Sequence, residues 1–147
     1  MNISDELYRE VILDHFKSPR HYGKIEKPDV LEVGVNPLCG DELQLFLSFK
    51  NGTIADIRFE GKGCSISRAS ASMMTDAVVD KSVEDARGIV ADFKGMMLEG
   101  KPAQSLPEPL EDSKSLEGVK NYPVRIKCAL LAWNTLLEGL KKYKSRS

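Results

Sequence analysis

Residues 41–64 have the sequence DELQLFLSFKNGTIADIRFEGKGC, and this stretch predicts a β-hairpin. Its first half alternates apolar and polar residues, which is typical of a strand with one buried face. Asn51 and Gly52 are a typical turn pair, and the alternation resumes from Ala55 to Phe59. The rest of the chain can be placed relative to these two strands.

The register of the hairpin determines which residues meet at its open end. If both apolar sets share one face, the numbers of paired residues must add to an even value, which excludes a two-residue loop. A three-residue loop at 50–52 meets this condition. We then expect Asp41 to face Gly61, and Cys39 to lie opposite Gly63. The hairpin would bring two cysteines and one carboxylate to the same end of the sheet.

Helical patterns flank the hairpin. Apolar residues at helical spacing predict helices at about 4–18, 65–80 and 82–99, and a long last helix from Pro123. A further strand is expected at 30–35, whereas three prolines among polar residues predict a surface segment at 102–121. The expected fold class is therefore α+β, with a small antiparallel sheet of about three strands packed against several helices and a long C-terminal helix.

The composition limits the classes of function. The chain has 147 residues, 41% hydrophobic and 29% charged, which fits a single domain spanning 1–147. The net charge is −1, so nothing indicates a nucleic-acid or anionic-membrane partner. No apolar run approaches the roughly 20 residues of a membrane span, and the N-terminus lacks the apolar region of a secretory signal. We expect a cytoplasmic protein in which the three cysteines are thiols.

Three thiols and one carboxylate are the candidate site. Cys39, Asp41, Cys64 and Cys128 together suit tetrahedral Zn²⁺, and they also suit iron in a sulfide cluster. There is no Cys-x-x-Cys motif, so spacing alone leaves buried inert cysteines as an alternative. The hairpin geometry favours a metal site.

Cations near these cysteines are candidates for balancing the negative charge of such a site. They are Arg125, Lys127 and Lys62, and the alternative for each is ordinary solvated charge. The two histidines, His15 and His21, are interpreted as structural or surface residues.

At these cysteines the sequence resembles the U-type iron–sulfur cluster assembly proteins, which include IscU, the N-terminal domain of NifU and SufU. The matching motifs are Cys39-Gly40-Asp41, Gly61-Lys62-Gly63-Cys64, and Cys128 at the start of the last predicted helix. An N-terminal likeness covers Tyr8, Asp14, His15, Pro19, Arg20, His21 and Gly23. Lys127 stands where IscU-like proteins have histidine, and 64 positions separate Cys64 from Cys128. Both features are similar to the SufU branch, and the second implies a family insertion roughly within 82–121.

The resemblance implies a zinc-bound sulfur acceptor in iron–sulfur cluster biogenesis. Zn²⁺ would be held by Cys39, Asp41, Cys64 and Cys128. A PLP-dependent cysteine desulfurase of the SufS type would be the partner, and one of its histidines would replace Cys39 at the metal. The freed Cys39 would accept the persulfide sulfur, and Arg125 would stabilise the sulfur during transfer. The sulfur would pass to a downstream Suf assembly scaffold or to apoproteins.

Two other interpretations remain open. The first is a scaffold that builds a transient [2Fe–2S] cluster, or binds iron, on the same cysteines. The second is a purely structural zinc site, for which Cys39→Ala would unfold the domain. An independent enzyme is disfavoured, since no general base or substrate pocket is evident in the sequence.

Overall fold

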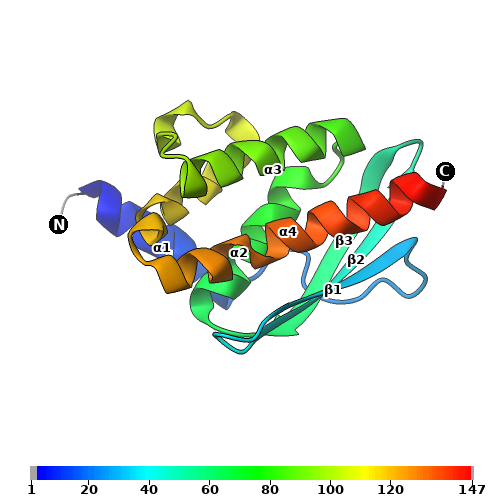
Figure 1. Cartoon of the computed structure of the whole chain (residues 1–147), viewed down its shortest axis with the longest axis horizontal. Coiled ribbons are helices and arrows are strands. Elements are labelled where there is room, and N and C mark those ends of the chain that lie inside the picture. Colours follow the sequence, from blue (N-terminus) through cyan, green and yellow to red (C-terminus); the bar gives the residue numbers. More distant parts are fainter. Residues whose placement is uncertain (1–2, 147) are drawn as a thin grey trace.

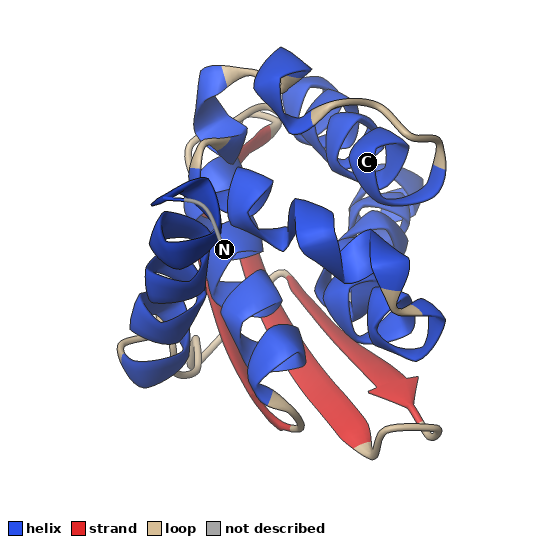
Figure 2. Cartoon of the chain, turned by 90° about the vertical axis from the view of Figure 1, so that its left-hand side faces the viewer, coloured by secondary structure: helices blue, strands red, loops and turns tan. Residues whose placement is uncertain are grey.

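The structure is a computed structural model that describes residues 3–146 of the chain, with side chains described for residues 6–144. Its sheet has the order β1-β2-β3 and is antiparallel throughout, with strands β1 Val30–Asn36, β2 Asp41–Lys50 and β3 Thr53–Lys62. The α-helices are α1 Ile3–Lys17, α2 Ser65–Val78, α3 Val83–Leu98 and α4 Pro123–Arg146. Figure 2 shows this sheet with the helices packed against it. The predicted α+β class with a long C-terminal helix is confirmed.

The hairpin register differs from the prediction. Asn51 and Gly52 have φ of 54° and 77° and form a two-residue turn between the paired residues Lys50 and Thr53. An irregularity follows at Ser48 and Phe49 of β2, where β3 carries one extra residue. The predicted three-residue loop is therefore wrong. A two-residue turn alone would put the apolar residues of the two strands on opposite faces of the sheet, and the extra residue on β3 returns them to the same face.

The shift changes which residues face the core and which meet at the open end. Ile54 is fully buried, and Ala55, which the alternation placed on the buried face, is exposed. The pair Glu42 and Lys62 closes the regular ladder. Asp41 therefore does not lie opposite Gly61, as predicted. It lies opposite the chain two residues further along, just before Cys64.

Helix α4 covers one face of the sheet, as Figure 1 shows. It approaches closely because Gly34 of β1 has no side chain; a Cβ there would collide with Thr135 of α4. Trp133 on α4 is fully buried and stacks on Phe93 of α3 with ring centroids 4.0 Å apart. Its indole N–H donates to Ser70 Oγ of α2 at 2.8 Å. The helix that carries Cys128 is therefore fixed to the sheet and to two other helices.

The segment between α3 and α4 is packed more closely than predicted. It forms the 3-10 helices η1 Ala103–Ser105, η2 Glu108–Leu110 and η3 Asp112–Asn121. Five of its apolar side chains are buried in the main core, namely Ala103, Leu106, Leu110, Leu116 and Val119. The prediction of a surface segment is wrong for these side chains, because their irregular spacing has no period that marks a buried face.

His15 ties this segment to the rest of the fold. The ring is fully buried, with Nδ1 2.7 Å from Ser72 Oγ and Nε2 2.8 Å from Asp112 Oδ2. The interpretation of His15 as a structural residue agrees with this position. Within residues 3–146 no helix is both long and apolar enough to cross a membrane.

Candidate metal centre

Three segments that are distant in sequence bring their side chains together at the open end of the hairpin. Cys39 lies in the loop between β1 and β2, Asp41 is the first residue of β2, and Cys128 lies near the start of α4. Their thiol sulfurs and a carboxylate oxygen all lie within 4.8 Å of one another. Asp41 and Cys128 are fully buried, whereas Cys39 is partly exposed.

The Asp41 carboxylate is held on both of its oxygens. Oδ1 accepts the backbone N–H of Cys64 at 3.0 Å, and Oδ2 accepts the side-chain N–H of Asn36 at 3.4 Å. Gly63 has φ of 150°, and a Cβ at this position would collide with the Asp41 carboxylate. The glycine before Cys64 is therefore required by close approach as well as by backbone conformation.

Cys64 occupies the N-cap of α2, as predicted from its position before that helix. Its Sγ accepts the backbone N–H of Ser67 at 3.5 Å, so the helix N-terminus favours the thiolate. Cys64 stands outside the tight group of three ligand atoms. It is nevertheless a neighbour of Cys128, since its charge and a hydrogen bond affect the pKa of that thiol.

Cys128 is the most enclosed of the three thiols. Burial, followed by side-chain hydrogen bonding with Cys39, Asp41 and Cys64, raises the pKa of Cys128 above its ordinary value. In the metal-free protein Cys128 is thus held as a neutral thiol. A metal that binds there must displace its proton, which couples metal binding to proton release.

The candidate cations near the cysteines separate into two groups. Arg125, in the first turn of α4, lies beside two thiols, and the charge of Cys64 and the hydrogen bond to Cys128 raise the pKa of its guanidinium. Lys62 is instead 4.0 Å from Glu42 and is highly exposed, and Lys127 is also exposed. Of the three, Arg125 is the cation that can balance charge at the cysteines.

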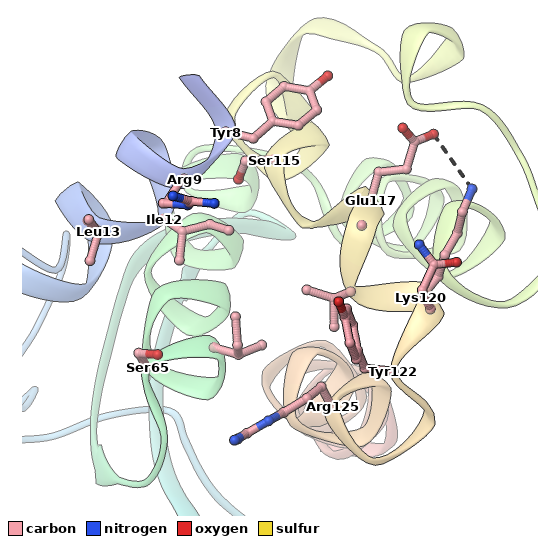
Figure 3. Close-up of a pocket in the computed structure, with 14 residues that line it drawn as sticks. Tyr8, Arg9, Ile12, Leu13, Ser65, Ser115, Glu117, Lys120, Tyr122 and Arg125 are labelled. Atoms are coloured by element: carbon pink, nitrogen blue, oxygen red, sulfur yellow. Dashed lines mark ion pairs between the residues drawn. The ribbon is translucent and has the colours of Figure 1, made fainter. Parts of the chain in front are cut away.

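An open pocket of about 840 Å³ begins beside Arg125. Figure 3 shows Tyr8 and Arg9 of α1 on one side and residues of η3 on the other, with Glu117 and Lys120 paired across 3.8 Å. Ser65, which follows Cys64 in the chain, also lines this pocket. The pocket depends on the packing of η3 against α1, and nothing in the sequence pattern indicated it.

The donor set fits a tetrahedral Zn²⁺ ion. Ligand atoms around such an ion lie roughly 3.3–3.8 Å apart, so atoms already within 4.8 Å need only a small inward movement. Cys39 and Cys128 supply soft sulfur ligands, Asp41 supplies a hard oxygen, and Cys64 adjoins Cys128 as the fourth candidate. The same thiols also fit iron, as Cys ligands do in sulfide clusters.

The fold and the site together define a class of protein: a small α+β domain that gathers thiols and one carboxylate at the end of a hairpin as a candidate metal centre. Comparisons with known proteins identify a family of this class. Residues 7–147 match the NifU-like N terminal domain family. The chain is 44% identical over 138 residues to the zinc-dependent sulfurtransferase SufU of Bacillus subtilis, covering 94% of this chain and 92% of that protein. This protein belongs to the NifU-like N-terminal domain family, and the resemblance found in the sequence is confirmed.

Two further relatives show the range of descriptions within the family. The iron-sulfur cluster assembly scaffold protein IscU of Streptococcus pyogenes is 44% identical over 140 residues, covering 94% of this chain and 85% of that protein. A crystal structure of a candidate iron-sulfur cluster assembly scaffold protein for the SUF system, from Fervidobacterium islandicum, superposes with a TM-score of 0.82 at 39% identity. The match covers 93% of this chain and 98% of that one.

Proposed function

We propose that this protein acts in iron–sulfur cluster assembly as a zinc-bound sulfur acceptor that takes persulfide sulfur from a cysteine desulfurase of the SufS type. The observation that carries the proposal is the contrast within the cluster. One partly exposed thiol, Cys39, sits on a loop beside a fully buried carboxylate and a fully buried thiol. A macromolecular donor can reach Cys39 while Asp41 and Cys128 stay covered.

The residues that would hold zinc are Cys39, Asp41, Cys64 and Cys128. Zinc, when bound, keeps the thiols deprotonated at neutral pH and has no redox chemistry of its own to consume the sulfur. Asp41 contributes the hard ligand of the set. Its two hydrogen bonds, from Cys64 and Asn36, keep the carboxylate directed into the cluster.

The transfer itself is a thiolate exchange at sulfur. The Cys39 thiolate attacks the terminal sulfur of the donor's persulfide, R–S–S–H, and a new S–S bond forms as the S–S bond of the donor persulfide breaks. The electron pair leaves with the donor as R–S⁻, and Cys39 carries –S–S–H. No external oxidant or reductant is needed in this step.

Arg125 supports this chemistry through charge. The neighbouring thiols of Cys64 and Cys128 raise the pKa of its guanidinium. A positive charge beside the cluster lowers the cost of gathering several thiolates and can stabilise the sulfur during transfer. Arg125 also borders the open pocket.

A second candidate function is a scaffold that assembles a [2Fe–2S] cluster for delivery to apoproteins. The same three thiols favour it, since Cys thiolates are the ligands of such clusters. The two candidates make opposite predictions about the metal that purifies with the protein.

The test combines metal content with desulfurase assays. We expect stoichiometric zinc in the purified protein and stimulation of alanine production by the cognate cysteine desulfurase. Cys39→Ala is expected to abolish the stimulation while the domain remains folded. Gln104→Ala, which changes an exposed residue of η1, is the control and should behave as wild type. Iron with a sulfide-to-iron absorption band and no stimulation would favour the scaffold, and unfolding of Cys39→Ala would favour a structural zinc site.

A further inference from the structure

Asn36, the last residue of β1, has a buried side chain at the edge of the metal centre. It is 6% exposed, and its Nδ2 is 3.4 Å from Asp41 Oδ2 and 3.7 Å from Cys128 Sγ. One amide nitrogen carries two hydrogens, so it can donate to both neighbours at once. The contact to Asp41 is at the long end for a hydrogen bond to oxygen, and the contact to Cys128 is longer because its acceptor is the larger sulfur atom.

The two atoms that Asn36 contacts belong to residues that other contacts already restrain. The second oxygen of Asp41 accepts the N–H of Cys64, and Cys128 lies on α4 at full burial. The amide therefore connects a strand-borne carboxylate to a helix-borne thiol across the cluster. It joins two elements that approach each other only in the folded protein.

Cys39 has no comparable support. Within the described residues, no backbone or side-chain N–H donates to its sulfur, whereas Ser67 N–H donates to Cys64 and Asn36 contacts Cys128. The Cys39 loop also contains Gly40 at φ of 69° and the exposed Leu38. N–H donors thus support Asp41, Cys64 and Cys128, and among the described residues they leave the sulfur of Cys39 without one.

We propose that Asn36 is a positioning residue that holds Asp41 and Cys128 together as the fixed half of the metal site, so that the metal stays bound when Cys39 leaves it. This proposal rests on zinc binding as stated under the proposed function. Partners that orient metal ligands typically change metal affinity about 10- to 100-fold when they are removed. Asn36 is expected to act in this range through its side chain alone.

The main chain of Asn36 has a separate structural role, which substitution leaves in place. Its backbone pairs with that of Asp41 in the β1–β2 ladder, and its carbonyl accepts the N–H of Cys39 at 3.3 Å. Asn36→Ala therefore removes the amide and keeps the loop. Asn36→Asp keeps the shape and replaces the two N–H donors with a carboxylate that repels Asp41.

The experiment measures zinc affinity by competition with a chelator in the full-length protein. We expect Asn36→Ala to weaken zinc binding about 10- to 100-fold and to shift the ligand-field bands of the Co²⁺-substituted protein. Asn36→Asp should weaken binding at least as much. Asn121→Ala, which removes an exposed asparagine that lines the open pocket, is the matched control and should bind zinc as wild type.

Combining variants tests the division of the site. The effect of Asn36→Ala should be additive with that of Cys39→Ala and should become smaller in a Cys128→Ala background, where only its contact to Asp41 remains, because coupled residues give non-additive effects. The melting temperature of each metal-free variant separates a folding defect from a positioning defect. Wild-type zinc affinity in Asn36→Ala or Asn36→Asp would overturn the proposal. So would a loss explained fully by unfolding of the metal-free protein, or equal coupling to both cysteines.

These outcomes can be told apart from failure of the proposed function. If the variants lose zinc as expected but the wild-type protein accepts no sulfur, the positioning role stands and the sulfur-acceptor role fails. If sulfur is accepted and the variants bind zinc within twofold of wild type, only the positioning role fails.

Discussion

Cys39 and Cys128 belong to one cluster, yet they are presented by opposite kinds of structure. Cys128 is fully buried on α4, where Ser70 Oγ donates to the carbonyl of the next residue, Ala129, at 2.6 Å. Cys39 is partly exposed in a short loop beside Leu38, which is 69% exposed. A site built this way can keep its shape through one half while the other half exchanges ligands.

The largest expected effect comes from loosening the helix that presents Cys128. Trp133→Ala removes a fully buried ring that stacks on Phe93 and donates to Ser70, and it should cost roughly 3–5 kcal/mol of the free energy of unfolding. Urea denaturation of the metal-free protein measures this loss. Trp133→Phe, which keeps the stacked ring, should cost less. Equal stability of wild type and Trp133→Ala would show that α4 does not hold the fixed half of the metal site in place.

A difference in thiol reactivity is the next largest effect. In the metal-free folded protein, iodoacetamide should alkylate Cys39 about 100-fold faster than Cys128, because a buried thiol reacts only after local opening. Peptide mapping by mass spectrometry over a time course gives both rates. In urea the two rates should become similar, which is the control. Similar rates in the folded protein would contradict the contrast between the two halves.

Two glycines offer a matched pair of smaller perturbations. Gly63→Ala places a Cβ against the Asp41 carboxylate at φ of 150°, so it should cost about 1–3 kcal/mol and lower the zinc content. Gly40→Ala meets no atom within 4 Å and introduces only the strain of φ at 69°, about 1–2 kcal/mol, with zinc retained. Denaturation and metal analysis compare the two. Zinc loss in Gly40→Ala alone would reverse the assignment of the halves.

The smallest effect is expected at the surface of the Cys39 loop. Leu38→Ala should change the free energy of unfolding by no more than about 0.5 kcal/mol, because the side chain is already exposed to solvent. Leu43→Ala, at 4% exposure on the adjacent strand, is the comparison and should cost roughly 2–5 kcal/mol. Thermal unfolding of both variants measures the difference. A large loss in Leu38→Ala would mean that the loop is as firmly packed as the strand.

Much of the fold could be predicted because each strand and helix repeats its apolar residues with a fixed period. The four α-helices and the three strands of the described chain follow the predicted order. The hairpin register could not be predicted, since the extra residue on β3 has no marker in the sequence and reverses the expected faces of Ile54 and Ala55. The buried residues of the segment before α4 were missed for lack of any period.

The candidate site divides in a similar way. Cys39, Asp41 and Cys128 were selected by residue type and by their places at the ends of predicted elements, and the structure brings them together. Asn36 lies three residues before Cys39 but carried no signal, because asparagine at the end of a strand commonly serves a turn. Its role is visible only where β1 meets α4.

The order of elements, the α+β class and the residue types of a metal site follow from the amino-acid pattern alone, because periodicity and ligand chemistry are local properties. Packing between distant segments decides the rest. It pairs Asp41 with the N–H of Cys64, buries Cys128, and brings the Asn36 side chain to both Asp41 and Cys128. Those contacts depend on how the bulged hairpin and α4 fit together, and no local pattern encodes that fit.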